Sequence, residues 1–213
     1  MISSQLYQEY LNCLLEGKRL DCTRIVQDLL DRDIPIKALY NDLFEKSLYQ
    51  VGQLWEFNRI SVAKEHLATA ITEGLLNLVY PRLFELEHQH KGKRIVISCA
   101  ANEFHQIGGK MVADICELNG WDTEFLGANM PLDHMLLHIQ ETKPDLVGLS
   151  LTVYFNISSL KKGIEAIRSN FSHLDIFVGG QAFLWGGTEM LKHYSGVEYI
   201  PTLNDIEKSI KES

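Results

Sequence analysis

The strongest constraint on the fold is a change of hydrophobic pattern near residue 91. Beyond this point short apolar runs of strand length alternate with amphipathic segments of helix length. The predicted strands are 94–99, 123–126, 146–151, 176–178 and 197–200, and the helices between them include 107–118 and 132–141. Strict alternation implies right-handed crossovers, which place the strands parallel in one sheet with helices on both faces. We therefore predict an α/β domain over residues 92–213.

The residues before this point carry only helix signals. Four stripes of apolar residues at helical spacing cover about 4–15, 22–30, 35–51 and 61–86. Ser3 or Ser4 can cap the first helix, Pro35 suits the first turn of the third, and Asn58 lies in the break before the fourth. Four antiparallel helices with short loops form a bundle. We predict a four-helix bundle over residues 1–91.

Composition and charge exclude several classes of protein. The chain has 213 residues, 46% of them hydrophobic and 23% charged, as in globular proteins. No apolar run reaches the ~20 residues that a membrane span needs, and the N-terminus lacks the pattern of a signal peptide. We expect a cytoplasmic protein without a membrane partner. A net charge of −8 also argues against direct contact with nucleic acid.

Two further sequence patterns concern the cysteines and residues 208–212. Cys13, Cys22, Cys99 and Cys116 form no CxxC pair and lie in apolar segments, which indicates reduced, packed thiols rather than a disulfide framework or a zinc site. The run 208–212 near the other end of the chain predicts an exposed helix face.

The topology predicts where a ligand binds. In an open parallel sheet of flavodoxin-like order, ligands bind at the carboxyl ends of the strands, between the first and the third strand. The loops 100–109, 150–156 and 179–183 follow the first, third and fourth predicted strands, so we expect them at one edge. The first of these loops lacks the glycine patterns that bind nucleotide phosphates. Nucleotide binding by those routes is therefore not expected.

The first loop instead offers a histidine beside a carboxylate. His105 can give one ring nitrogen to a metal while Glu103 accepts the proton on the other nitrogen. Gly108 and Gly109, which have no Cβ, would let a bulky group approach the backbone. A simpler interpretation is that His105 caps a helix that begins at Gln106.

Three motif pieces together resemble a known family. Glu103-x-His105-x-x-Gly108, Ser150-x-Thr152 and Gly179-Gly180 follow predicted strands in this order. They are similar to the Asp-x-His-x-x-Gly, Ser-x-Leu and Gly-Gly signature of the cobalamin-binding domain, which methionine synthase, corrinoid methyl-transfer proteins and cobalamin photoreceptors share. The resemblance implies a four-helix cap followed by a Rossmann-like domain, with cobalamin as the cofactor.

The resemblance also implies roles for single residues. His105 would be the lower cobalt ligand in place of the nucleotide base, and Glu103 would be its hydrogen-bond partner. Ser150 and Thr152 would line the slot for the displaced dimethylbenzimidazole tail. Further cofactor contacts are expected at Gln106, Ile107, Gly108, Gly179, Gly180 and Gln181. Glu103 stands where most members have Asp, and Thr152 replaces Leu. Alternatively, Ser150 and Thr152 simply end a strand.

The helical half carries a second resemblance. Trp55, followed by Glu65-His66, is similar to the Trp and Glu-His pattern in the cap of photoreceptors of the CarH and LitR type. The resemblance implies that these three residues cover the upper cobalt face and an adenosyl group. Glu56 stands where those proteins have a histidine after the tryptophan. The alternatives are that Trp55 and His66 are ordinary buried residues of the bundle.

Two functions follow from these resemblances. The first is a regulatory or light-sensing protein in transcription regulation, with adenosylcobalamin favoured over methylcobalamin and hydroxocobalamin. Since the N-terminus has no helix-turn-helix module, its partner would be a separate regulatory protein or a second copy. The second is a corrinoid methyl carrier, although carriers usually have Asp and Lys where this chain has Gln106 and Gly109. A domain without a cofactor is the remaining alternative. No catalytic constellation is recognisable, so we do not expect an enzyme.

Overall fold

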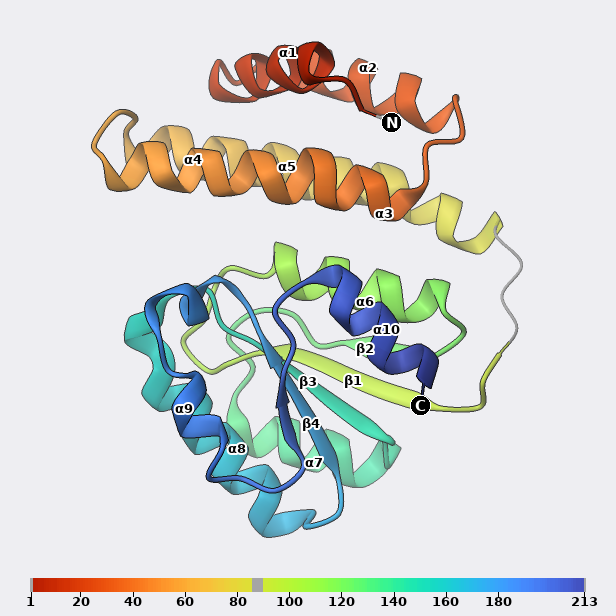
Figure 1. Ribbon diagram of the computed structural model, residues 1–213, viewed down its shortest axis with the longest axis vertical. Coiled ribbons are helices and arrows are strands. Elements are labelled where there is room, and N and C mark those ends of the chain that lie inside the picture. Colours follow the sequence, from red (N-terminus) through yellow and green to blue (C-terminus); the bar gives the residue numbers. More distant parts are fainter. Residues whose placement is uncertain (1, 86–89, 213) are drawn as a thin grey trace. The chain divides into compact units, whose positions relative to one another are not determined.

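The computed structural model describes residues 2–85 and 90–212 and divides into two compact units, residues 1–86 and 87–213 (Figure 1). We call the first the helical unit and the second the α/β unit. The predicted end of the fourth helix, at residue 86, lies outside the described residues.

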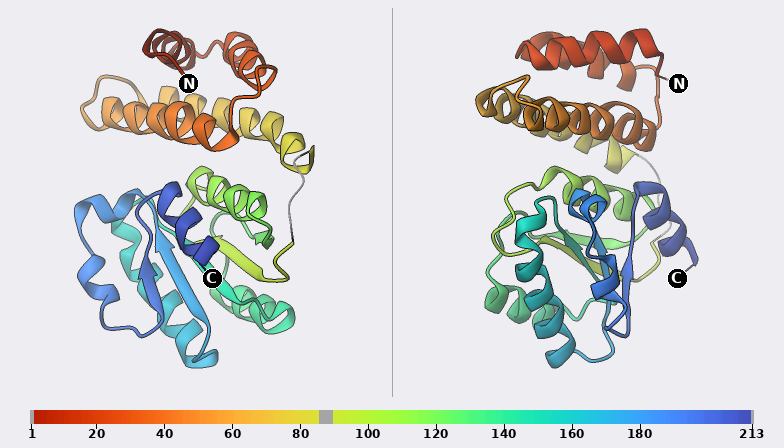
Figure 2. Two further views of the ribbon diagram at one scale, coloured as in Figure 1. Left: turned by 45° about the vertical axis from the view of Figure 1, so that its right-hand side comes forward. Right: turned by 60° about the vertical axis from the view of Figure 1, so that its left-hand side comes forward.

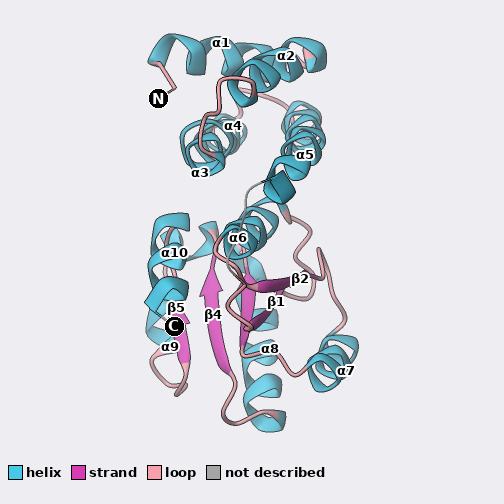
Figure 3. Ribbon diagram, turned by 90° about the vertical axis from the view of Figure 1, so that its right-hand side faces the viewer, coloured by secondary structure: helices cyan, strands magenta, loops and turns pink. Residues whose placement is uncertain are grey.

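The described part of the helical unit is a four-helix bundle, as predicted (Figure 3). Its elements are α1 (Ser4–Leu15), α2 (Arg19–Leu30), α3 (Ile36–Leu39), the π-helical η1 (Tyr40–Glu45), α4 (Lys46–Glu56) and α5 (Val62–Glu85). Because α3, η1 and α4 follow one another without a break, they form the third predicted helix. The second helix begins at Arg19, earlier than predicted.

Local chemistry explains the ends of these helices. The Ser3 hydroxyl accepts a hydrogen bond from the backbone N–H of Leu6 at 3.2 Å and so caps α1. Pro35 directly precedes α3. Asn58 adopts a left-handed conformation, with φ of 55°, in the turn that separates α4 from α5. Tyr10, Phe44 and other large apolar side chains that face the inside of the bundle are fully buried.

The α/β unit contains a five-stranded, fully parallel sheet of order β2-β1-β3-β4-β5 in its described residues (Figure 2). The strands are β1 (Arg94–Cys99), β2 (Asp122–Phe125), β3 (Leu146–Ser150), β4 (Asp175–Gly179) and β5 (Val197–Tyr199). The helices are α6 (Ile107–Leu118), α7 (Leu132–Thr142), α8 (Ile157–Asn170), α9 (Thr188–Leu191) and α10 (Leu203–Glu212). The flavodoxin-like order is therefore confirmed. Two short 3₁₀ turns that we did not predict follow β3 and β4, namely η2 (Tyr154–Asn156) and η3 (Gln181–Trp185).

Helices cover both faces of this sheet. α6 and α10 pack together on one face, and α7 and α8 lie on the other (Figure 1). The prediction of an exposed helix face at 208–212 holds for Lys208 and Lys211, whose side chains are exposed, but not for Ile210, which is buried in α10. The helix begins at Leu203, and it buries Leu203, Ile206 and Ile210 at helical spacing. Trp121 donates a hydrogen bond from its ring N–H to the carbonyl of Ile210 at 3.3 Å, which ties this end of the chain to the sheet.

The cysteines agree with the sequence analysis. All four are free thiols, and Cys22, Cys99 and Cys116 are buried. Burial raises the pKa of each of these three thiols to about 12, so they remain protonated at neutral pH. Among the described residues, no helix combines the length and the apolar character that crossing a bilayer requires.

Gly179 and Gly180 have a structural role that the sequence did not show. Gly180 has φ of 115° and ψ of 167°, a conformation that is essentially restricted to glycine. A Cβ at Gly180 would lie 2.2 Å from the carbonyl oxygen of Leu151, and one at Gly179 would lie 2.8 Å from that of Ile200. The glycines therefore let the end of β4 pass close to neighbouring backbone within the protein itself.

Gly180→Ala should destabilise the α/β unit by at least about 2 kcal/mol, because it adds backbone strain and a steric clash. The matched control is Gly163→Ala in α8, where a Cβ would meet only Leu149, at 3.9 Å. We expect this control to be neutral or slightly more stable than the wild type, since alanine favours the helix. Urea unfolding followed by circular dichroism measures both changes. Equal stability of the two variants would contradict this interpretation of Gly180.

Candidate functional site

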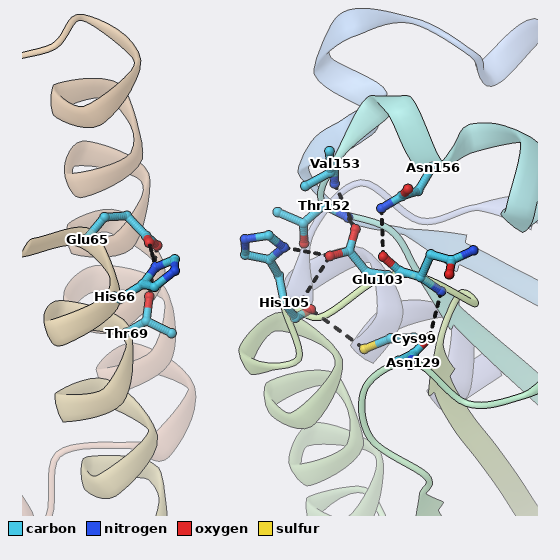
Figure 4. Close-up of polar contacts among 11 residues, drawn as sticks. Glu65, His66, Thr69, Cys99, Glu103, His105, Asn129, Thr152, Val153 and Asn156 are labelled. Carbon is cyan, nitrogen blue, oxygen red and sulfur yellow. Dashed lines mark hydrogen bonds and ion pairs between the residues drawn. The ribbon is translucent and has the colours of Figure 1, made fainter. Parts of the chain in front are cut away.

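The loop between β1 and α6 places a histidine against a buried carboxylate (Figure 4). His105 Nδ1 lies 2.6 Å from Glu103 Oε1, and the backbone N–H of His105 donates to the same oxygen at 3.0 Å. Glu103 is fully buried, whereas the His105 side chain is 46% exposed. Since an ionised carboxylate only accepts hydrogen bonds, the proton lies on Nδ1. Nε2 is then the ring nitrogen suited to bind a metal.

The second carboxylate oxygen of Glu103 holds another loop. Glu103 Oε2 accepts hydrogen bonds from the backbone N–H groups of Thr152 and Val153, at 2.9 and 2.8 Å. Burial alone would raise the pKa of the Glu103 carboxyl. Hydrogen bonds from the His105 ring and from three backbone N–H groups outweigh burial and lower this pKa to about 2. Glu103 is therefore ionised at neutral pH and connects the loop after β1 to the loop after β3.

Three asparagines fasten these loops further, and the sequence analysis did not identify them. The Asn102 backbone N–H donates to Asn129 Oδ1 at 2.9 Å, and Asn156 Nδ2 donates to the Asn102 carbonyl at 2.9 Å. The backbone N–H of Asn129 donates to the Glu103 carbonyl at 2.8 Å. Asn102 has φ of 65°, which asparagine tolerates better than most residues. Each asparagine lies in the segment that follows a different strand. This position, at the carboxyl edge of the sheet, was the feature of the sequence that could have identified them.

The structure does not support the interpretation of His105 as a helix cap. α6 begins at Ile107, and its N-cap residue is Gln106, whose side chain makes no capping hydrogen bond. The imidazole is instead bonded to Glu103. The carbonyl of His105 accepts a weak hydrogen bond from the thiol of Cys99 at 3.6 Å, which further fixes the position of this residue.

The remaining predicted residues of the α/β unit lie at the same sheet edge. Ser150 ends β3, and Thr152, just beyond it, joins the site through its backbone N–H. A Cβ at Gly109 would lie 3.5 Å from Ser150 Cβ, so Ser150 faces α6. A Cβ at Gly108 would meet nothing within 4 Å. Ile107 is the buried first residue of α6, and Gly179, Gly180 and Gln181 lie at the carboxyl end of β4.

The loops at this edge also carry exposed apolar side chains, which the sequence analysis missed. They come from the loops after β1, β3 and β4, and they are Phe104, Tyr154, Phe155, Leu184 and Trp185. Exposed apolar side chains that gather in one place often mark binding surfaces. Within residues 2–85 and 90–212, no group of three or more His, Cys, Asp or Glu side chains is arranged to hold a metal ion.

In the helical unit, Trp55 and His66 are exposed rather than packed in the core, whereas the Glu65 side chain is only 16% exposed. Trp55 is the next-to-last residue of α4 and is 47% exposed. His66, on α5, has a side chain that is 73% exposed. Glu65 joins this group, because one of its carboxylate oxygens lies 2.5 Å from His66 Nδ1 and the other accepts from the Thr69 hydroxyl at 3.0 Å (Figure 4). The interpretations of Trp55 and His66 as buried residues are therefore wrong.

Comparison with protein families gives two matches. Residues 93–201 match the model of a B12 binding domain, and residues 6–80 match a second B12 binding domain model. Together the two models cover most of both units.

Single proteins give weaker but consistent matches. The HTH-type transcriptional repressor CarH of Myxococcus xanthus is 27% identical over 163 residues, which cover 74% of this chain and 52% of CarH. CarA, the corresponding repressor from the same organism, is 33% identical over 93 residues, which cover 43% of this chain and 31% of CarA. The chain therefore spans about half the length of the first relative and less of the second.

Among solved structures, the monomethylamine corrinoid protein of Methanosarcina barkeri superposes with a TM-score of 0.83. The superposition covers 98% of this chain and 99% of that protein, at 11% sequence identity. At such low identity the match shows a common fold, a helical region followed by a parallel α/β domain.

Glu103→Gln and Glu103→Asp should each destabilise the cofactor-free protein by about 1–3 kcal/mol. The amide of glutamine turns an N–H group toward a donor, and the shorter aspartate does not serve His105 and the loop after β3 together. Urea unfolding of the purified variants measures the effect. The control is Glu189→Gln, an exposed carboxylate paired with Lys192, for which we expect a change within about 0.5 kcal/mol. A Glu103 variant as stable as this control would contradict the prediction.

Proposed function

The chain belongs to the B12 binding domain family, and we propose that it is a regulatory protein that holds cobalamin base-off, with His105 as the lower cobalt ligand. The observation that carries this proposal is the hydrogen bond between His105 Nδ1 and the buried carboxylate of Glu103. The proposal also includes a helical bundle, residues 1–91, over the upper face of the cofactor, and a cofactor-binding domain over residues 92–213.

The residues present fit this cofactor. Imidazole is a good ligand for first-row transition metals of borderline softness. Ligating histidines almost always donate their other ring N–H to a partner such as a carboxylate, which raises their basicity. Glu103 is such a partner, and it is ionised. When bound, cobalamin supplies a cobalt ion that accepts one ligand on each face of the corrin ring and, in the adenosyl form, a light-sensitive cobalt–carbon bond.

The edge around His105 supplies a slot for the displaced nucleotide tail in this proposal. Ser150 faces α6, and the open space above Gly108 lies in the first turn of the same helix. Gln106 is the N-cap residue of α6, the buried Ile107 is its first residue, and Thr152 follows the end of β3. Gly179, Gly180 and Gln181 lie at the carboxyl end of the neighbouring strand, β4. These residues would contact the tail and the corrin ring.

Trp55, Glu65 and His66 would cover the upper face. The exposure of Trp55 and His66 supports this role, because residues that are packed in the bundle core cannot contact a ligand. Glu65 orients the His66 ring by holding Nδ1. A half-exposed indole offers a ring face on which an aromatic base such as adenine can stack, so adenosylcobalamin is the favoured form over methylcobalamin and hydroxocobalamin. Because Glu56 follows Trp55, a histidine on the upper face of cobalt is not expected from this position.

Two observations favour a regulator over a methyl carrier. The relatives CarH and CarA are named as transcriptional repressors. Carriers usually have Lys at the position of Gly109, where a Cβ would lie only 3.1 Å from the Phe125 ring. The partner that receives the signal would be a separate regulatory protein or a second copy of this chain, and the net charge of −8 argues against direct contact with DNA.

His105→Ala should weaken hydroxocobalamin binding and shift the visible spectrum of the bound cofactor, because it removes the lower ligand. Glu103→Gln should have a smaller effect, with affinity lowered by about 10–100-fold. The matched control is His138→Ala, since His138 also lies 2.6 Å from a carboxylate, that of Glu124, outside the site. Absorbance titration measures both quantities. If His105→Ala behaves like this control, the assignment of His105 is wrong.

Light should change the assembly of the protein loaded with adenosylcobalamin. Trp55, Glu65 and His66 would contact the adenosyl group only in the dark, and losing such contacts can shift an equilibrium between two arrangements. Size-exclusion chromatography with absorbance detection, dark against illuminated, measures this change. The protein loaded with hydroxocobalamin should elute at the same volume under both conditions.

Trp55→Ala is the variant that tests this lid. It should weaken binding of adenosylcobalamin much more than binding of hydroxocobalamin, because only the former fills the space beneath the indole. Equal effects on both forms would mean that Trp55 does not cover the adenosyl group. If light has no effect and the protein accepts methyl groups from a corrinoid methyltransferase, it is a carrier.

A further inference from the structure

A cavity of about 210 Å³ lies in the α/β unit. Residues of the loop after β1, of β3 and of α8 line it, together with Met130 just before α7 and Leu132 and Met135 in its first turn. Most of its wall is apolar, including Leu149 and Leu160. α7 and α8 pack together on this face of the sheet, so the cavity has a well-formed frame.

This cavity lies on the opposite face of the sheet from the proposed tail slot. Side chains of successive residues in a strand point to opposite faces. Ser150 faces α6, because its Cβ lies 3.5 Å from the position of a Cβ at Gly109. The preceding residue, Leu149, therefore points to the other face, where it lines the cavity. The cavity is a separate feature from the cofactor site.

The size and chemistry of the cavity define a class of ligand. An engineered apolar cavity of roughly 150 Å³ admits benzene, whereas pockets for drug-sized ligands begin at about 300 Å³. The ligand is therefore a small molecule with a compact apolar body. Lys162 is the one charged residue among the described residues that line the cavity, and Ser159 lies near it on α8. A cation and a hydroxyl beside an apolar wall suit a carboxylate with a hydrocarbon tail.

We propose that this cavity binds a small carboxylate with an apolar body of about six carbon atoms. The carboxylate pairs with Lys162 and Ser159. The hydrocarbon chain packs against Met130, Met135 and Leu160. Two methionines give the wall an adaptable shape, which suits a flexible chain.

Occupancy of the cavity is transmitted to the loop that carries His105. Asn102 lines the cavity, and its Nδ2 donates to the Ser159 hydroxyl at 3.3 Å. Asn102 directly precedes Glu103 and also accepts a hydrogen bond from Asn156 through its carbonyl oxygen. A carboxylate that accepts the O–H of Ser159 repositions the hydroxyl to which Asn102 donates, and so changes the support of the Glu103–His105 pair. That this change regulates the cofactor rests on the proposed function.

The test uses cofactor-free protein and sodium hexanoate as the probe. The chain contains five methionines, and labelling their methyl groups with ¹³C gives one NMR signal for each. The signals of Met130 and Met135 should shift, while those of Met111 and Met190, which do not line the cavity, should not. Hexylamine, the matched cation, should produce no shift at the same concentration. Equal shifts with hexylamine, or no shift with hexanoate at any soluble concentration, would overturn the proposal.

Two pairs of variants locate the site. Lys162→Gln should weaken hexanoate binding by about two- to fivefold, the effect of losing an exposed ion pair, whereas Lys161→Gln should not. Gly163→Leu should abolish binding, because its side chain enters the cavity and its Cβ meets only Leu149. Gly74→Leu, at an open position of α5, is the control. Unchanged binding in both Lys162→Gln and Gly163→Leu would overturn the proposal.

The transmitted effect has its own readout. On addition of hexanoate the backbone amide signals of Asn102 and Glu103 should shift in a ¹⁵N spectrum of the same protein. If the methionine signals move and these amides do not, the connection to the His105 loop is wrong. Because no cobalamin is present, a failure here leaves the cofactor proposal intact, and a failure of cobalamin binding leaves this one intact.

Discussion

The buried carboxylate of Glu103 is the interaction on which the carboxyl edge of the sheet depends. Removing a charge from water is costly unless hydrogen bonds replace the lost hydration. Here the His105 ring and three backbone N–H groups supply them, and they come from two loops that are far apart in sequence. The cost of an unsatisfied buried charge therefore keeps both loops in place. The position of the imidazole follows from this, as does its tautomer.

The neighbouring features are arranged around this clamp. Asn129 and Asn156 bind the backbone of Asn102 and Glu103, so the segments after β2 and β3 both hold the loop after β1. Gly180 lets the end of β4 approach Leu151, the residue before the two amides that Glu103 binds. The longer arm of glutamate, compared with aspartate, reaches both partners. The local backbone thus accommodates a glutamate at position 103, where most family members have aspartate.

Periodicity and spacing were sufficient to predict the architecture and the pairing of Glu103 with His105. Alternating strand and helix segments determine a parallel sheet, and a histidine two residues after a carboxylate can bond to it within one turn of chain. The backbone amides of Thr152 and Val153 were not predictable, because any residue type carries an N–H group. The clearance at Gly180 and the burial of Ile210 depend on contacts with distant residues, which local patterns do not contain. The exposure of Trp55 and His66 was not readable from the sequence, because a helical stripe does not show which of its ends packs into the bundle.

The close approach of Gly109 to the Phe125 ring also limits how this chain can diverge. A lysine at 109, as in methyl carriers, would require the phenyl ring to move or to be replaced by a smaller side chain. A smaller side chain at 125 would remove this contact, so the two positions are coupled. Related sequences with a larger residue at 109 should therefore carry a smaller side chain at 125, and the two positions should covary.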